Sequence, residues 1–384
     1  MGYPVTANVA HPHYPDWKLQ PGHRQWTRAE MLDGVGVTRR LHYVPSSPRG
    51  FRRLASELTF GVRLLFARLG RPTVVIAVSP SLFSTALAAV RLRITPHRPA
   101  LVVWVQDIYT LGLAETGEGG GFAARVARWV ESRTLRSADR VVVVHERFAD
   151  FVTQQLGVAA AKVTVVRNWT HLPPSEPADA YAAKGALGWP AGMILAVHTG
   201  NMGVKQGLEN VIEAAREADR RDAPVHFILV GSGGEQQALK RAADGVSHVT
   251  FVDPLSSDHY ALALAAADVL LVNEKPGVAN MAVPSKLTSY FDAGRPIVAA
   301  TDRAGITASE IEASGAGVVV PAGNPAAFLD AVLALGADSE LAAQLSANGR
   351  RYRETVLSQR AAIEQWARIV DDAAVGRRRT VAGP

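Results

Sequence analysis

The stretch Val283-Pro-Ser-Lys-Leu-Thr-Ser-Tyr-Phe-Asp-Ala-Gly-Arg-Pro-Ile-Val-Ala299 has the pattern of a loop, a short helix and a buried strand. Pro284 suits the first helical turn, where a missing N–H is tolerated, and Ser285 offers an N-cap. Gly294 is expected to end the helix before the apolar strand begins. The free N–H groups at the start of such a helix favour an anion, and Lys286 adds a positive charge. This stretch therefore predicts an anion site.

Short apolar runs rich in valine and isoleucine recur on both sides of this stretch and alternate with amphipathic segments. Continuous apolar strands separated by helices are typical of parallel sheets that are covered on both faces. We therefore expect an α/β protein with two doubly wound, Rossmann-like sheets. The expected strands cover residues 5–10, 73–78, 100–105, 140–145, 163–166, 193–198, 225–230, 248–252, 269–273, 297–300 and 317–320.

The length of the chain also favours two domains, because its 384 residues exceed the ~100–200 residues of a typical domain. A proline-rich, polar connector at residues 168–177 marks the expected seam. The first domain is predicted at 1–170 together with a returning helix at about 357–375, and the second at 171–356. Because the chain opens with what resembles a second strand, the first strand–turn–helix unit is expected to be missing.

Charge is divided unevenly between the two halves of the chain, whose net charge is +6. Residues 1–167 contain 22 Lys and Arg and 11 Asp and Glu, whereas the remainder contains 19 Lys and Arg and 24 Asp and Glu. A basic first half indicates contact with a polyanion or an anionic membrane surface. The helix expected at 52–71 is interpreted as an ordinary surface helix, with docking on anionic lipid as the alternative. Nucleic acid is disfavoured because the arginines have no interleaved aromatic platforms.

Composition excludes several classes of site and segment. The chain has no cysteine, which excludes disulfides, thiolate metal ligands and cysteine nucleophiles. The N-terminus lacks the pattern of a signal peptide. The most apolar window, 74–90, is interrupted by a proline and several hydroxyl residues, so it predicts a strand and a helix instead of a membrane span. We expect a cytoplasmic protein, peripheral on the inner face of the plasma membrane.

Three loops in the second half follow expected strands and could converge on one anion. The first contains Gly200, Asn201 and Lys205, the second contains Gly231 and Ser232, and the third is the opening stretch. Glycines allow the backbone to approach a phosphate closely, and ligands of open α/β sheets bind at the carboxyl ends of the strands. Neither a Walker loop nor a dinucleotide GxGxxG fingerprint in its strand–turn–helix setting is present, which argues against an α/β oxidoreductase.

These motifs resemble those of the GT-B glycosyltransferases of glycosyltransferase family 4, most closely the branch that builds bacterial surface polysaccharides of the colanic-acid and O-antigen type. The resemblance covers almost the whole chain. It implies two Rossmann-like domains that face a cleft, with the C-terminal helix crossing back to the first domain. The matching segments are residues 12–18, 33–35, 106–107, 168–169, 200–207, 231–233, 284–287 and 293–296.

The resemblance also implies roles for individual residues. Lys205 matches the family's donor-pyrophosphate lysine, and Asn201 stands where many members have a partner arginine. Met281 and Ser289 stand where most members have the two glutamates of the E-x7-E motif, so neither acid is present. The expected donor-binding residues are Gly200, Asn201, Lys205, Gly231, Ser232, Pro284, Ser285, Lys286, Leu287 and Ser289.

Candidate acids and bases follow from the same comparison. Asp107 stands beside the position where many relatives place a histidine, so it is the candidate catalytic carboxylate, with a helix cap as the alternative. Glu274 and Glu310 could contact a hydroxyl group of the donor, but the preferred interpretation of both is a surface acid. His145 and His171 are weaker catalytic candidates.

The resemblance predicts a retaining glycosyltransferase that moves a sugar from a UDP- or GDP-linked donor to a glycan acceptor, expected to be linked to polyprenyl diphosphate. The sequence has no Asp-x-Asp motif, and lysines with helix N-termini are expected to stabilise the leaving nucleotide, so no metal is predicted. The alternative is a non-catalytic homologue that binds nucleotide sugars, because the two glutamates are absent.

Overall fold

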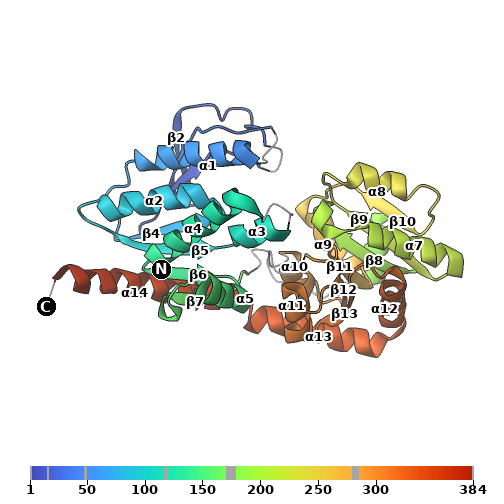
Figure 1. The fold of residues 1–384 in the computed structure, drawn as a ribbon. Helices are drawn as coiled ribbons and strands as arrows, with labels where there is room; N and C mark the ends of the chain where they lie inside the picture. The colour runs from blue at the N-terminus through green and yellow to red at the C-terminus, as the bar shows by residue number, and fades with distance from the viewer. Residues whose placement is uncertain are drawn as a thin grey trace. The chain divides into compact units, whose positions relative to one another are not determined.

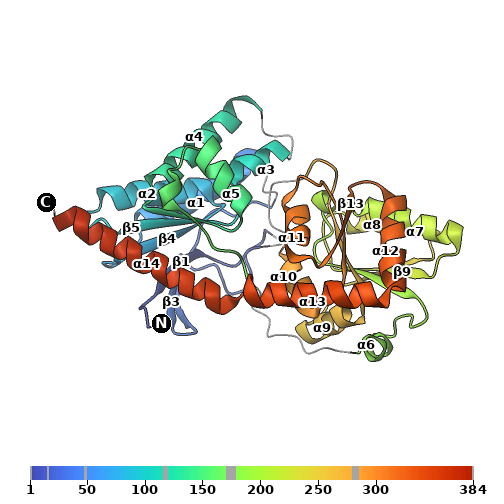
Figure 2. The same ribbon diagram turned by 90° about the horizontal axis from the view of Figure 1, so that it is seen from below.

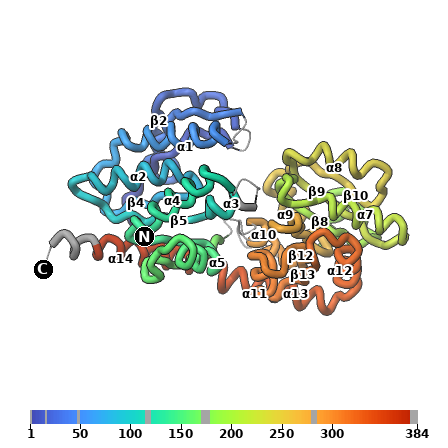
Figure 3. Tube along the Cα trace, viewed as in Figure 1, coloured from blue at the N-terminus to red at the C-terminus, as the bar shows by residue number. Residues whose placement is uncertain are grey.

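The computed structural model describes residues 2–14, 17–46, 50–115, 120–169, 179–278 and 285–382, with only the backbone at 114–115 and 377–382. The chain forms two compact units, one of Met1–Val166 with Ile363–Pro384 and one of Arg167–Ala362. Each unit contains a parallel sheet with helices packed on it (Figure 1). The tube in Figure 3 follows the chain through both units, and the second boundary between them falls within the last helix.

The first unit contains two sheets. Strands β4, β5, β6 and β7 form a parallel sheet in that order, and the smaller sheet has the order β1-β3-β2. Helix α14 lies along one face of the larger sheet, with α2 and α4 on the other (Figures 1 and 2). The elements are β1 (Thr6–Ala10), β2 (Thr27–Leu32), β3 (Val35–Arg40), α1 (Gly50–Leu65), β4 (Val74–Ser79), α2 (Leu82–Ile94), β5 (Ala100–Val105), α3 (Tyr109–Glu115), α4 (Gly121–Ser137), β6 (Arg140–Val143), α5 (Glu146–Asp150), a π-helical turn η1 (Phe151–Gln155), a 3-10 turn η2 (Ala160–Lys162), β7 (Val163–Val165) and most of α14 (Gln359–Ala382).

A β-hairpin in the first unit was not predicted. Strands β2 and β3 pair antiparallel across the dipeptide Asp33–Gly34. Both residues have positive φ, 49° and 79°, which is the conformation of a two-residue hairpin turn of the primed type. β1 then pairs with β3 in parallel, so the strand expected at 5–10 belongs to this small sheet.

The second unit contains one parallel sheet of six strands, in the order β10-β9-β8-β11-β12-β13. Its strands lie within about two residues of the expected ranges. The elements are α6 (Ala180–Leu187), β8 (Ile194–Thr199), a 3-10 turn η3 (Val204–Gln206), α7 (Glu209–Arg221), β9 (Val225–Val230), α8 (Gln236–Ala242), β10 (Val249–Val252), α9 (Ser257–Ala266), β11 (Val269–Asn273), α10 (Lys286–Ala293), β12 (Ile297–Thr301), α11 (Ile306–Ser314), β13 (Gly317–Pro321), α12 (Pro325–Ala337) and α13 (Ser339–Thr355).

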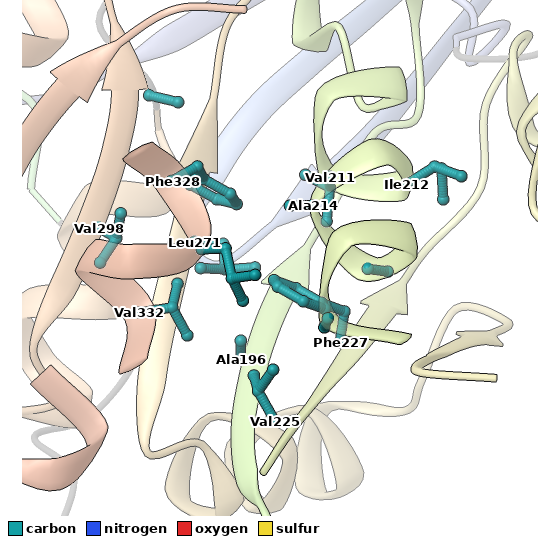
Figure 4. Close-up of a cluster of buried hydrophobic side chains, with 14 of the residues drawn as sticks. Ala196, Val211, Ile212, Ala214, Val225, Phe227, Leu271, Val298, Phe328 and Val332 are labelled. Carbon is teal, nitrogen blue, oxygen red and sulfur yellow. The ribbon is translucent and has the colours of Figure 1, made fainter. Parts of the chain in front are cut away.

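Both faces of this sheet are buried, which explains why its strands are apolar at successive positions. Ala196 belongs to the core on the side of α7 and α12 (Figure 4), whereas its neighbours Leu195 and Val197 belong to the core under α10. In the first core, the rings of Phe227 and Phe328 stack with centroids 6.4 Å apart. The sheet is therefore a rigid support for the loops that follow its strands.

Candidate functional site

The site lies where the winding of the second sheet changes direction. From β8 the chain proceeds to β9 and β10 on one side, and then returns to β11 on the other side of β8. The connections that leave the carboxyl ends of β8 and β11 therefore go to opposite faces. Ligands of open α/β sheets bind at such a switch point, and the three predicted loops belong to this end of the sheet.

Two of the predicted glycine loops are packed directly against each other. The N–H of Met202 donates to the carbonyl of Ser232 at 2.8 Å, and the N–H of Gly200 donates to that of Val230 at 2.9 Å. A Cβ atom on Gly231, whose φ is +137°, would lie 2.0 Å from the carbonyl oxygen of Gly200. Only glycine can occupy this position without a shift of the backbone, so the structure brings Gly200 and Gly231 together as one surface.

Helix α10 begins at Lys286 and ends at Gly294, which has a left-handed φ of 59°, as the sequence predicts. The predicted cap is wrong, because Ser285 makes no side-chain hydrogen bond to the helix start. Its backbone is already helical, with φ −57° and ψ −27°, whereas a capping residue is usually extended. Its carbonyl instead accepts the hydroxyl of Thr288 at 2.8 Å.

Lys286 reaches from the start of α10 to the end of β8. Its Nζ lies 3.4 Å from both ring nitrogens of His198, distances that fit an ammonium over the imidazole ring. A Cβ on Gly200 would lie 3.9 Å from the same Nζ, so the ammonium borders the glycine loop. His198 is fully buried, whereas Lys286 keeps partial exposure. The ammonium group of Lys286 therefore lies at the surface of the loop that contains Gly200.

Burial changes the protonation of both groups. It lowers the pKa of Lys286 to about 7, although the carboxylate of Glu274 acts in the opposite direction. Burial and the charge of Lys286 hold the pKa of His198 well below its usual range, so this imidazole is neutral at physiological pH. Lys286 is thus partly deprotonated near neutral pH, and its neutral amine can gain a proton when an anion arrives. His198 was not predicted, since its position at the end of an apolar strand gave no signal of a contact 88 residues away.

Hydrogen bonds fix α10 over the two strands of the switch point. The hydroxyl of Tyr290 accepts the N–H of Thr199 at 2.9 Å and donates to the carbonyl of Leu271 at 3.3 Å. Leu287 is 2% exposed and packs in the core beneath the helix, while Ser289 is half-buried. Of the residues predicted on this helix, Leu287 therefore contributes packing, and Lys286 contributes the charge.

The loop that carries Lys205 is attached to β11. Lys205 lies in η3, and its carbonyl accepts the N–H of Lys275 at 2.8 Å. The buried amide of Asn273 donates to the carbonyls of Gln206 and Gly207, both at 2.8 Å. Asn201, at the other end of the same loop, lies with its Nδ2 3.5 Å from Oε1 of Gln206. The predicted Lys205 loop is therefore joined to the same sheet edge as the Lys286 helix.

Removing the Asn273 amide is expected to loosen this loop. In Asn273→Ala the carbonyls of Gln206 and Gly207 lose their buried donors, which costs about 1–3 kcal/mol of unfolding free energy. Urea unfolding measures this loss. Gln237→Ala, which removes an exposed amide on α8, is the control and is expected to stay within about 0.5 kcal/mol of the wild type. Equal stability of the two variants would contradict the assignment.

Two glutamates interpreted as surface acids have internal partners instead. Glu310 is 2% exposed, pairs with Arg167 and accepts the hydroxyl of Tyr352 at 3.2 Å. Glu274 accepts the hydroxyl groups of Thr301 and Thr307. The interpretation as surface acids is therefore wrong for both residues. Their partners are distant in the sequence, so the local sequence pattern could not show that these carboxylates are engaged.

The candidate catalytic residues lie in the first unit or outside the described residues. Asp107 is in the loop between β5 and α3 and is half-buried. The first N–H groups of α3, those of Tyr109 and Thr110, donate to the buried Glu131 at 2.8 and 3.1 Å. His145 caps α5 by accepting the N–H of Arg147 at 3.0 Å, which is a structural role. His171, Met281 and Pro284 lie outside the described residues.

Comparison with known proteins identifies the family. Residues 1–169 match the family described as glycosyl transferase 4-like domain, and residues 194–338 match glycosyl transferases group 1. A protein of Escherichia coli K12 named for colanic acid biosynthesis, the glycosyl transferase WcaI, is 31% identical over 306 residues, which are 77% of this chain and 74% of that protein. The chain belongs to glycosyltransferase family 4. This glycosyltransferase is a member of the surface-polysaccharide branch, as the sequence motifs predict.

Solved structures confirm the GT-B fold of the glycosyltransferase. Sucrose-phosphate synthase from Thermosynechococcus elongatus superposes with a TM-score of 0.74 and 15% identity, covering 97% of this chain and 100% of that one. HepE from Anabaena, in complex with UDP and glucose, has a TM-score of 0.66 and 18% identity, covering 88% and 86%. Within the described residues, no three His, Asp or Glu side chains are grouped as metal ligands, and no helix is long and apolar enough to cross a membrane.

Proposed function

We propose that the second unit of this glycosyltransferase binds the diphosphate of a UDP- or GDP-linked sugar. The observation that carries the proposal is the Lys286 ammonium at the start of α10, beside the paired loops of Gly200 and Gly231. A helix N-terminus, glycines that allow close approach of the backbone, and a cation all favour a phosphate. The related HepE structure holds UDP and glucose, which supports a nucleotide sugar as the donor.

Lys205 supplies the second cation in this proposal. As the diphosphate leaves, negative charge develops on its oxygens, and Lys205, Lys286 and the N-terminus of α10 would stabilise it without a metal ion. Transfer would occur with retention at the anomeric carbon. The first unit, with its basic sequence and Asp107, would bind a glycan acceptor linked to polyprenyl diphosphate, at the inner face of the plasma membrane.

Lys205→Ala is expected to lower turnover about tenfold to a hundredfold, since a charge-assisted contact contributes about 1.5–3 kcal/mol. Lys240→Ala, an exposed lysine on α8, is the matched control and should behave as the wild type. Turnover with a lipid-linked sugar acceptor is the measurement. Wild-type turnover in the Lys205 variant would refute its place in the donor site.

The proposed function is tested by thermal shift with UDP, GDP and NAD, followed by a transfer assay. Stabilisation by UDP or GDP and not by NAD is expected, and NMR of the product distinguishes retention from inversion. A transfer assay with and without a metal chelator tests whether the reaction is independent of metal ions. Nucleotide binding without any transfer would favour the non-catalytic homologue, and stabilisation by NAD alone would overturn the donor site.

A further inference from the structure

Helix α4 presents an unusual outer surface. Phe122 and Trp129 are 75% and 63% exposed, and Val126 between them is 36% exposed. Spacings of four and three residues place all three side chains on one face of the helix. Together with Arg125 they line a shallow surface hollow. Large apolar side chains grouped at the surface in this way indicate a surface that binds something.

The charges on this helix are sorted between its two sides. Its four arginines, at positions 125, 128, 133 and 136, are all exposed, whereas its one acid, Glu131, is 2% exposed and accepts N–H groups from the start of α3. Arg125, Arg133 and Arg136 fall at helical spacing on the same face as Phe122 and Trp129. We call these six residues, Phe122, Arg125, Val126, Trp129, Arg133 and Arg136, the α4 face.

The rest of α4 is firmly held by the first unit. Arg128, beside the α4 face, donates to the carbonyl of Gln155 at 3.0 Å, and the hydroxyl of Ser132 donates to that of Leu156 at 2.7 Å. Ala124, Ala127 and Leu135 are buried on the inner side. The α4 face is therefore a rigid, outward surface, and its exposure does not come from a loosely attached helix.

Helix α1, the segment considered for lipid docking from the sequence, differs in its charges. Arg53 lies over the ring of Tyr109 at 5.1 Å, and Arg63 lies over the ring of Trp26 at 3.7 Å. Two of the three arginines of α1 are thus engaged inside the first unit, although Arg52 is exposed and α1 also exposes Phe51, Leu58 and Val62. Because α4 has four exposed arginines and α1 has one, α4 is the better candidate for contact with a polyanion.

We propose that the α4 face docks on an anionic phospholipid bilayer. Trp and Phe are favoured at the membrane interface, and a basic amphipathic helix lies in the interface plane with its apolar side chains inserted. A row of arginines without an exposed acid complements anionic head groups, whereas a protein surface usually offers both signs. This inference deepens the proposed function, because an acceptor linked to polyprenyl diphosphate lies in such a bilayer.

Vesicle flotation of the full chain tests the proposal. The wild type is expected to float with phosphatidylcholine vesicles that contain phosphatidylglycerol, and much less with phosphatidylcholine alone. Arg125→Gln with Arg133→Gln should weaken binding to the anionic vesicles about tenfold or more, since each basic residue near the surface contributes a severalfold factor. Phe122→Ser with Trp129→Ser should weaken it to a similar degree.

Matched controls lie in the second unit. Arg241→Gln with Arg351→Gln removes the same charge from exposed positions, and Tyr181→Ser removes an aromatic side chain that is 71% exposed. Both should bind vesicles as the wild type does. The thermal shift by UDP or GDP, recorded for each variant, verifies folding and reports on the proposed function separately from lipid binding.

Three results would overturn the proposal. The first is a wild type that does not float with the anionic vesicles, and the second is α4 variants that float as well as the wild type does. The third is release of the wild type from the vesicles by an RNA oligonucleotide that binds the α4 face more tightly, which would indicate nucleic acid as its partner.

Discussion

Gly231→Ala is expected to lose about a hundredfold or more in turnover, because about 1 Å of displacement in a positioned site can cost a hundredfold. The added Cβ would lie 2.0 Å from the carbonyl oxygen of Gly200, and φ of +137° is unfavourable for any side chain. Since the obstacle is backbone, no side-chain rotation relieves it. The loops that follow β8 and β9 must separate, which removes the surface that we propose for the diphosphate.

Gly234→Ala is the control for this experiment. Gly234 belongs to the same loop, but a Cβ there would meet no atom within 4 Å. It should retain turnover and nucleotide affinity close to those of the wild type. Calorimetric titration with UDP and GDP measures the affinity, and circular dichroism verifies the fold. Wild-type affinity and turnover in Gly231→Ala would show that the diphosphate does not use this pair of loops.

The second large effect is a dependence of nucleotide affinity on pH through Lys286. Its pKa in the folded protein is about 7, so the charged fraction falls as the pH rises above this value. Affinity for a nucleoside diphosphate should therefore decline between about pH 7 and about pH 9, where an ordinary lysine stays charged. A bound phosphate raises the pKa of Lys286, so binding at about pH 8 should take up a proton.

Titration calorimetry in buffers of different ionisation enthalpy measures this uptake. Lys286→Met should weaken binding about tenfold to a hundredfold near neutral pH and should abolish both the pH dependence and the proton uptake. Lys240→Met, which removes an exposed lysine on α8, should retain both. A wild type whose affinity stays constant over this pH range would contradict the role of Lys286.

The parallel sheets could be predicted from the sequence because their strands are buried on both faces. Runs such as Val225–Val230 and Val269–Asn273 have the same bounds in the structure. The hairpin at Asp33–Gly34 was missed although the dipeptide is a strong turn signal, because its strands mix polar and apolar residues and contain no apolar run. The predicted architecture contained only doubly wound parallel sheets, so it included no antiparallel strand.

The glycine loops and Lys286 were predicted because they follow strands in a pattern that has a physical meaning. His198, Asn273 and Tyr290 were not, since each acts through a partner far along the chain. A histidine or an asparagine at the end of an apolar strand indicates polarity at the sheet edge, but not which loop it fixes. Ser285 shows the converse, because a favourable residue type at a helix start did not form the expected hydrogen bond.

Helix α14 has a consequence for dividing this protein into parts. Its residues Ile369 and Ala373 are buried, Trp366 meets Trp104 with ring centroids 4.9 Å apart, and Asp371 accepts the hydroxyl of Tyr3 at 2.9 Å. A fragment that ends at Val166 would expose the apolar surface that α14 covers and would tend to aggregate. An independently folding first unit would have to combine two separate segments of the chain, with residues 363–382 joined behind residue 166.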